Sequence, residues 1–148
     1  MPRYLEDLQP GDVFFSPALT VGADEIDTFA RTYDPQPFHL DPEAAAQSFF
    51  GTLVASGWHT AALTMRLIVT SEMDVAGGYL GAAVDEMRWP HPVVPGDELR
   101  VRIEVLEVRP SRSKPDRGLV RSKIETQRGD GATVQHFIVT MVVPARPR

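Results

Sequence analysis

Cysteine is absent from the 148 residues of this chain. That absence excludes disulfide frameworks, thiol nucleophiles and cysteine-ligated zinc. The chain also lacks a run of about eighteen apolar residues, which a membrane-spanning helix requires. Residues 1–7 contain no apolar stretch of the kind found in secretory signals. We therefore expect a cytoplasmic protein that does not bind a membrane.

Positive charge is scarce as well. Lysine and arginine number 15 against 20 acidic residues, so the net charge is −5. Such a chain has no general attraction for nucleic acid, and we expect no nucleic-acid partner. The 43% of hydrophobic and 24% of charged residues are typical of a folded globular protein. The length fits a single domain over residues 1–148 with its own core.

Several sequence motifs of catalysis and cofactor binding are missing. The chain contains no HExxH, no GxGxxG, no phosphate-binding P-loop and no GxSxG. Its four histidines do not have the spacing of zinc ligands. We therefore expect neither a metal nor a cofactor.

What is present is a set of short helical patterns followed by strand patterns. Helices are predicted over residues 22–32, 41–48 and 57–71 from apolar spacing and capping residues. Alternating apolar and polar side chains predict strands over 99–105 and 120–126. A largely apolar run predicts a strand over 134–143, and a weaker pattern rich in glycine and alanine predicts one over 79–89. Because residues 134–143 are apolar on both faces, we expect that strand to lie inside the sheet. The order favours an α+β domain with one antiparallel sheet.

The helix predicted over residues 57–71 is apolar on nearly its whole circumference. A helix that is apolar all round must be buried all round. In a chain of this length, only a sheet wrapped around the helix can bury it. The pattern therefore predicts a curved antiparallel sheet around a long central helix.

Asp34 and His39 are five residues apart in a segment that also contains Pro35 and Pro37. Proline fixes the backbone and disfavours helix in the residue before it, so the run from Asp34 to His39 is not expected to be regular helix. Histidine titrates near neutral pH and a carboxylate can orient it, so the two can move protons together. The simpler interpretation is a turn-forming aspartate and a half-buried histidine.

Gly57 opens the predicted central helix, with Ser56 as its N-cap. The first N–H groups of a helix have no intrahelical partners and carry the positive end of the helix dipole. A buried helix start is therefore a candidate oxyanion hole. The alternative is that Gly57 is required for packing.

A basic cluster surrounds the loop predicted over residues 111–118 and comprises Arg109, Arg112, Lys114 and Arg117. One interpretation is a solvated surface loop. The other is a phosphate contact for a ligand with a nucleotide tail.

Together these residues resemble the MaoC-like dehydratases, which include the (R)-specific enoyl-CoA hydratases. The resemblance lies in Asp34-x-x-Pro37-x-His39, in Gly57 eighteen residues after His39, and in Val94-Pro95-Gly96-Asp97 before the long strands. Gln36 stands where the family usually has asparagine, and Ser56 stands where its hydratases often have histidine.

The resemblance implies a hot-dog fold and the reversible hydration of a trans-2-enoyl-CoA to a (3R)-3-hydroxyacyl-CoA. Asp34 and His39 would activate a water, and the Gly57 N–H would stabilise the developing enolate. Ser56, Trp58, His59 and Phe38 are expected to contact the acyl-CoA substrate. The family also implies a homodimer or a higher homo-oligomer.

Two other functions remain open for the same fold. The first is an acyl-CoA thioesterase, in which one carboxylate activates water against the thioester carbon. The second is a protein that binds acyl-CoA without turnover.

Overall fold

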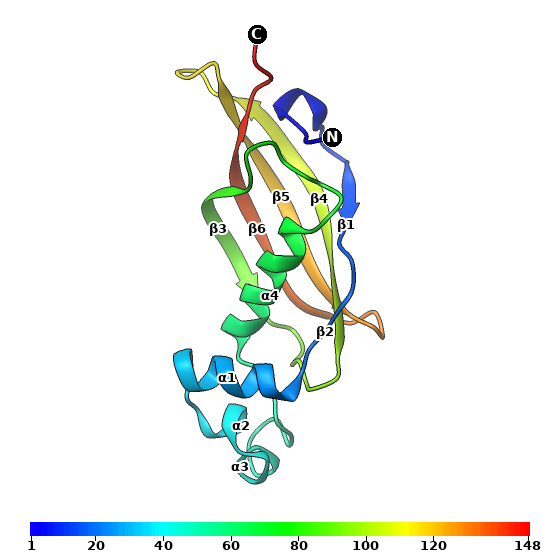
Figure 1. Cartoon of the computed structure of the whole chain (residues 1–148), viewed down its shortest axis with the longest axis vertical. Coiled ribbons are helices and arrows are strands. Elements are labelled where there is room, and N and C mark those ends of the chain that lie inside the picture. Colours follow the sequence, from blue (N-terminus) through cyan, green and yellow to red (C-terminus); the bar gives the residue numbers. More distant parts are fainter.

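The computed structural model describes residues 1–148 and is built around one six-stranded antiparallel sheet (Figure 1). The strands run in the order β1-β4-β5-β6-β3, and β2 pairs with the same strand as β1. β6 lies between β5 and β3, so the prediction of an interior strand is confirmed. The strands are β1 (Val13–Phe15), β2 (Leu19–Thr20), β3 (Leu80–Arg88), β4 (Glu98–Pro110), β5 (Arg117–Arg128) and β6 (Thr133–Pro144).

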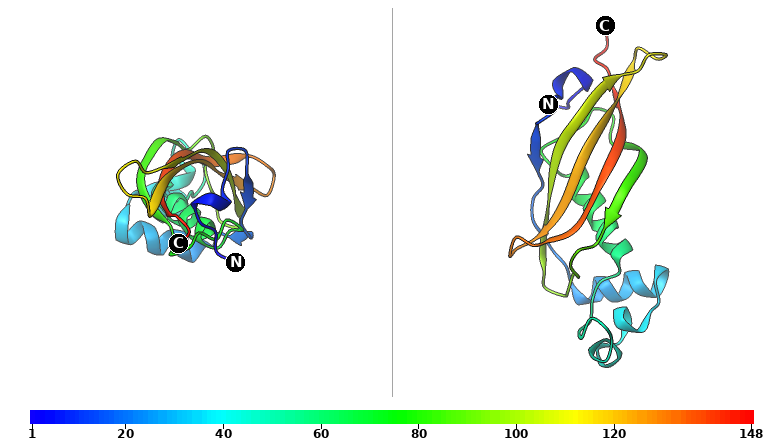
Figure 2. Two further views of the ribbon diagram at one scale, coloured as in Figure 1. Left: turned by 90° about the horizontal axis from the view of Figure 1, so that it is seen from above. Right: turned by 180° about the vertical axis from the view of Figure 1, so that it is seen from behind.

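The helices precede most of the strands in sequence. The view from above in Figure 2 shows the sheet curving around α4, so the predicted hot-dog arrangement is confirmed. Beside a 3₁₀ turn, η1 (Leu5–Asp7), the helices are α1 (Ala23–Tyr33), α2 (Pro37–Leu40), α3 (Pro42–Ala46) and α4 (Gly57–Val69). None of these helices has the length and hydropathy that crossing a membrane demands.

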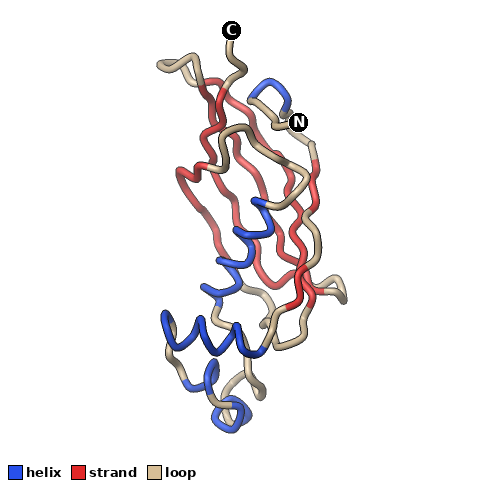
Figure 3. The backbone as a smooth tube through the Cα atoms, in the orientation of Figure 1, coloured by secondary structure: helices blue, strands red, loops and turns tan.

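The two ends of the molecule differ in structure. Figure 3 shows α1, α2 and α3 gathered beyond one end of the sheet, next to the start of α4. The β4–β5 hairpin and both chain termini lie at the other end (Figure 1). The functional elements predicted from sequence therefore collect at the helical end.

The core lies between the sheet and α4, and it follows the alternation seen in the sequence. Along β4, Leu99, Val101, Ile103 and Val105 are buried, while Arg100 between them is exposed. The strand extends to Pro110, beyond the predicted limit at residue 105, because it pairs with β5 along its whole length. Burial of apolar side chains on alternate positions is the main stabilising contribution of the sheet.

The prediction that the central helix is buried on all sides is wrong. Trp58, Met65 and Val69 are 60%, 44% and 53% exposed, whereas Thr60 and Thr64 are buried. These threonines tolerate burial because their hydroxyls are hydrogen-bonded, as when Thr64 Oγ1 lies 2.6 Å from Thr126 Oγ1. One apolar face of α4 therefore remains uncovered in the single chain.

β3 forms an uncovered edge of the sheet. It pairs only with β6, and its outer side has no neighbouring strand. Leu80 and Val84 on this strand are 62% and 52% exposed. An open strand edge with apolar side chains is a typical site for pairing with another chain.

The expectation that residues 34–39 contain no regular helix is wrong in its second half. Residues 34–36 are non-helical, but Pro37 begins the single turn of α2, which contains His39. Proline is compatible with the first helical position because the N–H there needs no intrahelical partner. Asp41 then caps α3 as predicted, accepting a hydrogen bond from the Glu43 N–H, although this helix ends at Ala46.

Candidate active site

Asp34 and His39 meet at the junction between α1 and α2. His39 Nε2 lies 3.2 Å from Asp34 Oδ2. The other ring nitrogen of His39, Nδ1, lies 2.7 Å from the carbonyl oxygen of Val54. Because a carbonyl only accepts hydrogen bonds, Nδ1 must carry a proton. Nε2 is therefore the nitrogen that faces the carboxylate.

Local backbone structure holds the two side chains in place. The Asp34 N–H bonds to the Ala30 carbonyl and ends α1, and the His39 N–H bonds to the Gln36 carbonyl within the next turn. The imidazole of His39 is buried and lies edge-on to the ring of Phe38, with the two ring centroids 4.6 Å apart. Both functional groups are thus fixed by secondary structure and by packing.

The Asp34 carboxylate is ionised more readily than usual. Burial on its own would raise the pKa of Asp34, but hydrogen bonds from Ser56 and Gln36 and the charge of His39 together lower the pKa below its ordinary value of 3.8. The hydrogen bonds are 2.7 Å from Ser56 Oγ and 2.6 Å from Gln36 Nε2. Asp34 is therefore a carboxylate at neutral pH and accepts protons or hydrogen bonds.

The start of α4 lies next to this pair. Ser56 caps the helix by accepting a hydrogen bond of 3.2 Å from the Trp58 N–H, and its carbonyl accepts from the N–H groups of His59 and Thr60. The Gly57 N–H makes no hydrogen bond in the structure. It is the free donor of the first turn, at the positive end of the helix dipole.

The segment Val54–Gly57 joins the two sides of the site. The Val54 N–H bonds to the Phe38 carbonyl, and the Ala55 N–H bonds to the Val93 carbonyl at 2.8 Å. Val54 also accepts from His39, and Ser56 donates to Asp34. Three consecutive residues therefore connect the catalytic candidates with the opposite wall, which residues 89–93 form.

A pocket of about 590 Å³ lies between these walls. Asp34, His39, Gly57, Phe38 and Trp58 line it, so the structure brings these five predicted residues together. The other lining residues are mostly aromatic or apolar: Gln36, Phe49, Phe50, Val54, Ala55, Thr60, Trp89, Pro90, His91, Pro92 and Val93. An apolar pocket with a few convergent polar groups is typical of small-molecule sites.

Two residues expected to contact substrate do not line this pocket. Ser56 is buried behind it and acts on Asp34. His59 points elsewhere and stacks on Phe29 of α1, with ring centroids 4.7 Å apart and planes inclined by 7°. Burial lowers the pKa of His59 below 6.5, with nearby Glu25 opposing the shift, and its Nδ1 has no hydrogen-bond partner.

Sequence reasoning missed Trp89, Phe49 and Phe50 as lining residues. The proline-flanked sequence Trp89-Pro90-His91-Pro92 was a usable signal, because prolines stiffen a loop that can form a wall. No sequence signal places Phe49 and Phe50 at the pocket, since they follow α3 in a turn whose direction depends on the tertiary fold.

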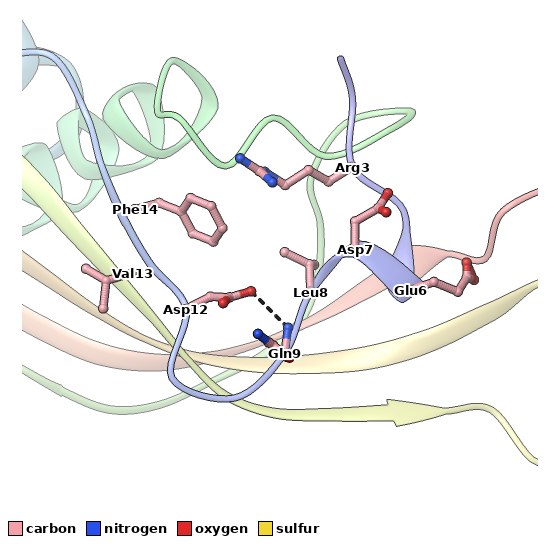
Figure 4. A pocket seen from close by; sticks show the side chains of 8 residues that line it. All are labelled: Arg3, Glu6, Asp7, Leu8, Gln9, Asp12, Val13 and Phe14. Atoms are coloured by element: carbon pink, nitrogen blue, oxygen red, sulfur yellow. Dashed lines mark hydrogen bonds between the residues drawn. The ribbon is translucent and has the colours of Figure 1, made fainter.

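A second hollow, of about 400 Å³, lies near the N-terminus (Figure 4). Its carboxylates already have partners, although the buried Arg3 Nε makes no hydrogen bond. Asp7 accepts from Arg146, Asp12 accepts from the Gln9 N–H, and the guanidinium of Arg3 covers the ring of Phe14. This hollow contains no histidine and offers no comparable acid–base pair.

The basic cluster of Arg109, Arg112, Lys114 and Arg117 lies at the β4–β5 hairpin, at the opposite end of the sheet from the helices (Figure 1). It is therefore far from Asp34 and His39 of the same chain. No group of three or more His, Cys, Asp or Glu side chains is placed to hold a metal ion.

Comparison with known sequences identifies the family. Residues 8–127 match the MaoC like domain. The chain belongs to the MaoC-like dehydratase family. Among curated MaoC relatives, it is 30% identical over 111 residues to the 3-hydroxybutyryl-CoA dehydratase of Methylorubrum extorquens, covering 75% of this chain and 69% of that one. It is 33% identical over 103 residues to Protein MaoC of Klebsiella aerogenes, covering 68% of this chain but only 30% of that protein.

Solved structures agree with this assignment. The MaoC-like dehydratase from Rhodospirillum rubrum superposes with a TM-score of 0.95 at 51% identity, covering 99% of both chains. The R-hydratase PhaJ1 from Pseudomonas aeruginosa superposes with a TM-score of 0.78 at 25% identity, covering 97% of this chain and 86% of that one. The family and its hydratase members indicate an enzyme of the hydratase and dehydratase class.

Proposed function

We propose that this MaoC-like protein catalyses the reversible hydration of a trans-2-enoyl-CoA to a (3R)-3-hydroxyacyl-CoA. One observation carries the proposal: the Asp34–His39 pair and the unbonded Gly57 N–H line the same apolar pocket. The pair can exchange a proton with water, and the N–H can stabilise negative charge on a thioester oxygen.

In the hydration direction, Asp34 and His39 hold one water beside C3 of the substrate. The pair takes a proton from this water while its oxygen forms the new C3–O bond. The electrons of the C2–C3 double bond move towards the thioester, and its oxygen becomes an enolate next to the Gly57 N–H. The enolate then collapses as the pair returns the proton to C2, so that one water has been added.

A thioesterase needs only one group to activate water against the thioester carbon. Here two titratable side chains lie together, with His39 Nε2 at 3.2 Å from Asp34 Oδ2. Hydration requires a group that both removes and returns a proton, and this pair fits that requirement. The relative from Methylorubrum extorquens, a 3-hydroxybutyryl-CoA dehydratase by name, supports the same choice.

The test is a panel of trans-2-enoyl-CoA thioesters of different length and branching, followed by the ultraviolet absorbance of the conjugated double bond. Loss of that absorbance, with (3R)-3-hydroxyacyl-CoA as product, supports the proposal. Release of free thiol from saturated acyl-CoA would identify a thioesterase instead. Thermal stabilisation by acyl-CoA without turnover of any thioester would identify a binding protein.

We also propose that two copies of the chain pair through β3. The edge of β3 is open, and Leu80 and Val84 on it are exposed. α4 also has exposed apolar side chains that a second copy could cover, namely Trp58, Met65 and Val69. A two-fold axis would set the two β3 strands antiparallel. It would also bring the acidic helical end of one copy towards the basic hairpin end of the other. Residues 23–46 carry acidic Asp24, Glu25, Asp27, Asp34, Asp41 and Glu43 against basic Arg31.

A further inference from the structure

Gly57 has no room for a side chain because Trp89 covers it. A Cβ atom on Gly57 would lie 2.8 Å from Trp89 Cε2 and 3.1 Å from both Cδ2 and Cζ2. Three atoms of the benzene ring are thus close to one side of the Gly57 Cα. The backbone at Gly57 has no positive φ angle, so backbone conformation does not explain the glycine. Contact with the indole does.

The indole is held by a hydrogen bond to the sheet. Trp89 Nε1 donates to Gln135 Oε1 at 2.8 Å. Gln135 lies on β6 and is wholly buried, and it does not line the pocket. β3 ends at Arg88, which pairs with His136, so Trp89 follows directly beside Gln135. Trp89 is 41% exposed, so enclosure by the core does not hold the ring, and this bond fixes its orientation.

The same glutamine is bound to α4. Gln135 Nε2 donates to Thr64 Oγ1 at 3.1 Å, and Thr64 also lies 2.6 Å from Thr126 Oγ1 on β5. The Thr64 hydroxyl is 2.8 Å from the Thr60 carbonyl, to which it can donate. Thr64 then accepts from both Gln135 and Thr126, which fills its two acceptor positions. We call Trp89, Gln135 and Thr64 the Trp89 clamp.

The clamp closes a loop around the first two turns of α4. Thr64 on α4 is hydrogen-bonded to Gln135, and Gln135 is hydrogen-bonded to Trp89. Trp89 in turn contacts Gly57 at the helix start. Asp34 is attached to this helix start from the other side, through Ser56. The start of α4 is therefore held on one side by Trp89 and on the other by Asp34.

We propose that Trp89 and Gln135 are positioning residues that set the Gly57 N–H for the transition state of the hydration. This inference rests on the proposed function. Gln135 does not line the pocket, so its loss would act on the substrate only through Trp89 and the start of α4. A misplaced donor weakens an interaction made mainly in the transition state, and displacement by about 1 Å can cost about 10²-fold in rate.

The test compares Gln135→Met, Trp89→Phe and the double variant with the wild type. Methionine removes the amide at similar volume, and phenylalanine keeps a ring but removes the N–H. We expect each single variant to lower kcat about tenfold or more, with KM for the enoyl-CoA changed less than about twofold in Gln135→Met. Because both changes break the same hydrogen bond, the double variant should lose little more than either single variant.

Val120→Ala is the matched control for lost stability. Val120 is wholly buried in β5 and pairs with Val108 and Met141, towards the hairpin end of the sheet. This variant should lower Tm as a cavity-forming change does, but leave kcat at 25 °C unaltered. If Gln135→Met is no slower than the wild type while Asp34→Asn is inactive, the positioning proposal is overturned and the proposed function stands.

An independent readout does not need turnover. The indole of Trp89 should shift the NMR signals of the Gly57 α-protons through its ring current. In Gln135→Met these signals should move towards ordinary glycine values, and in Val120→Ala they should not. Unchanged signals in Gln135→Met would overturn the clamp. If the wild type hydrates no enoyl thioester, the proposed function fails, the role in hydration fails with it, and the NMR signals alone decide whether the clamp exists.

Discussion

Ser56 Oγ donates a hydrogen bond of 2.7 Å to Asp34 Oδ2, joining residues 22 positions apart in the sequence. The same hydroxyl accepts from the Trp58 N–H and caps α4. One side chain thus connects the ionisation of the proposed base to the start of the central helix.

Ser56→Ala should therefore change the pH profile. The Ser56 hydrogen bond lowers the pKa of Asp34 against the opposing effect of burial, so its loss should raise that pKa. Since Asp34 acts as a carboxylate, the acid limb of kcat/KM should move to higher pH. Loss of the cap should also cost about 1 kcal/mol of stability. Ser71→Ala, which removes a buried hydroxyl beyond the other end of α4, should lose stability without moving the limb.

Asp34→Asn and His39→Ala should each lower kcat at least about a hundredfold, because acid–base assistance contributes roughly 10²–10⁴-fold. Circular dichroism should show an unchanged fold. Asp41→Asn is the matched control, since asparagine also caps helices and Asp41 does not line the pocket. If purified Asp34→Asn hydrates an enoyl-CoA with the kcat of the wild type, the assigned roles are wrong.

Much of this site could be predicted from sequence because its signals are local. Asp41 and Ser56 are N-caps recognisable within three residues, and the alternation in β4 and β5 identifies the face that packs on the core. Asp34 and His39 come together because only three non-helical residues, 34–36, separate α1 from the proline-started turn of α2.

The rest depends on contacts that hydrophobicity does not encode. The sequence pattern of α4 does not distinguish Met65, which is exposed, from Leu67, which is buried. Thr64 is buried because Thr126 and Gln135 bind its hydroxyl, and these partners are about sixty and seventy residues away. From its place in the first turn we expect His59 at the pocket, but its ring stacks on Phe29 of α1 instead, a contact between two helices that local sequence does not encode.

His59 makes stability depend on pH. Burial lowers the pKa of His59 below its ordinary 6.5, so below that pH the unfolded chain binds a proton that the folded chain does not. The stabilising contribution of the neutral ring is complete above pH 6.5 and is lost as the pH falls through the folded-state pKa. His59→Phe should remove this dependence and add about 1 kcal/mol, since it replaces a buried Nδ1 without a partner.

Urea unfolding of His59→Phe and wild type at pH 7.5 and pH 5 measures this effect. The exposed His91 provides the control variant His91→Gln, which should keep the wild-type difference between the two pH values. An equal loss of stability on acidification in His59→Phe and wild type would contradict the assignment.

Val84→Arg should convert the proposed dimer into monomers. Val84 is exposed on the open edge strand β3, and an arginine from each copy would place like charges close to the two-fold axis. Light scattering coupled to size exclusion measures the mass. Val13→Arg, an equivalent change on β1 at the other edge of the sheet, should remain dimeric. A wild-type monomer at micromolar concentration would refute pairing through β3.

The hydrogen bonds between α4 and the sheet affect which sequence changes the fold tolerates. Thr64, Thr126 and Gln135 contribute little apolar area, yet their hydrogen bonds permit only one rotational setting of the helix against the strands. Replacing all three with aliphatic residues would allow α4 to rotate its exposed apolar face, with Met65 and Val69, towards the sheet. We expect such a variant to have a higher Tm and yet to direct the Gly57 N–H away from the Asp34–His39 pair.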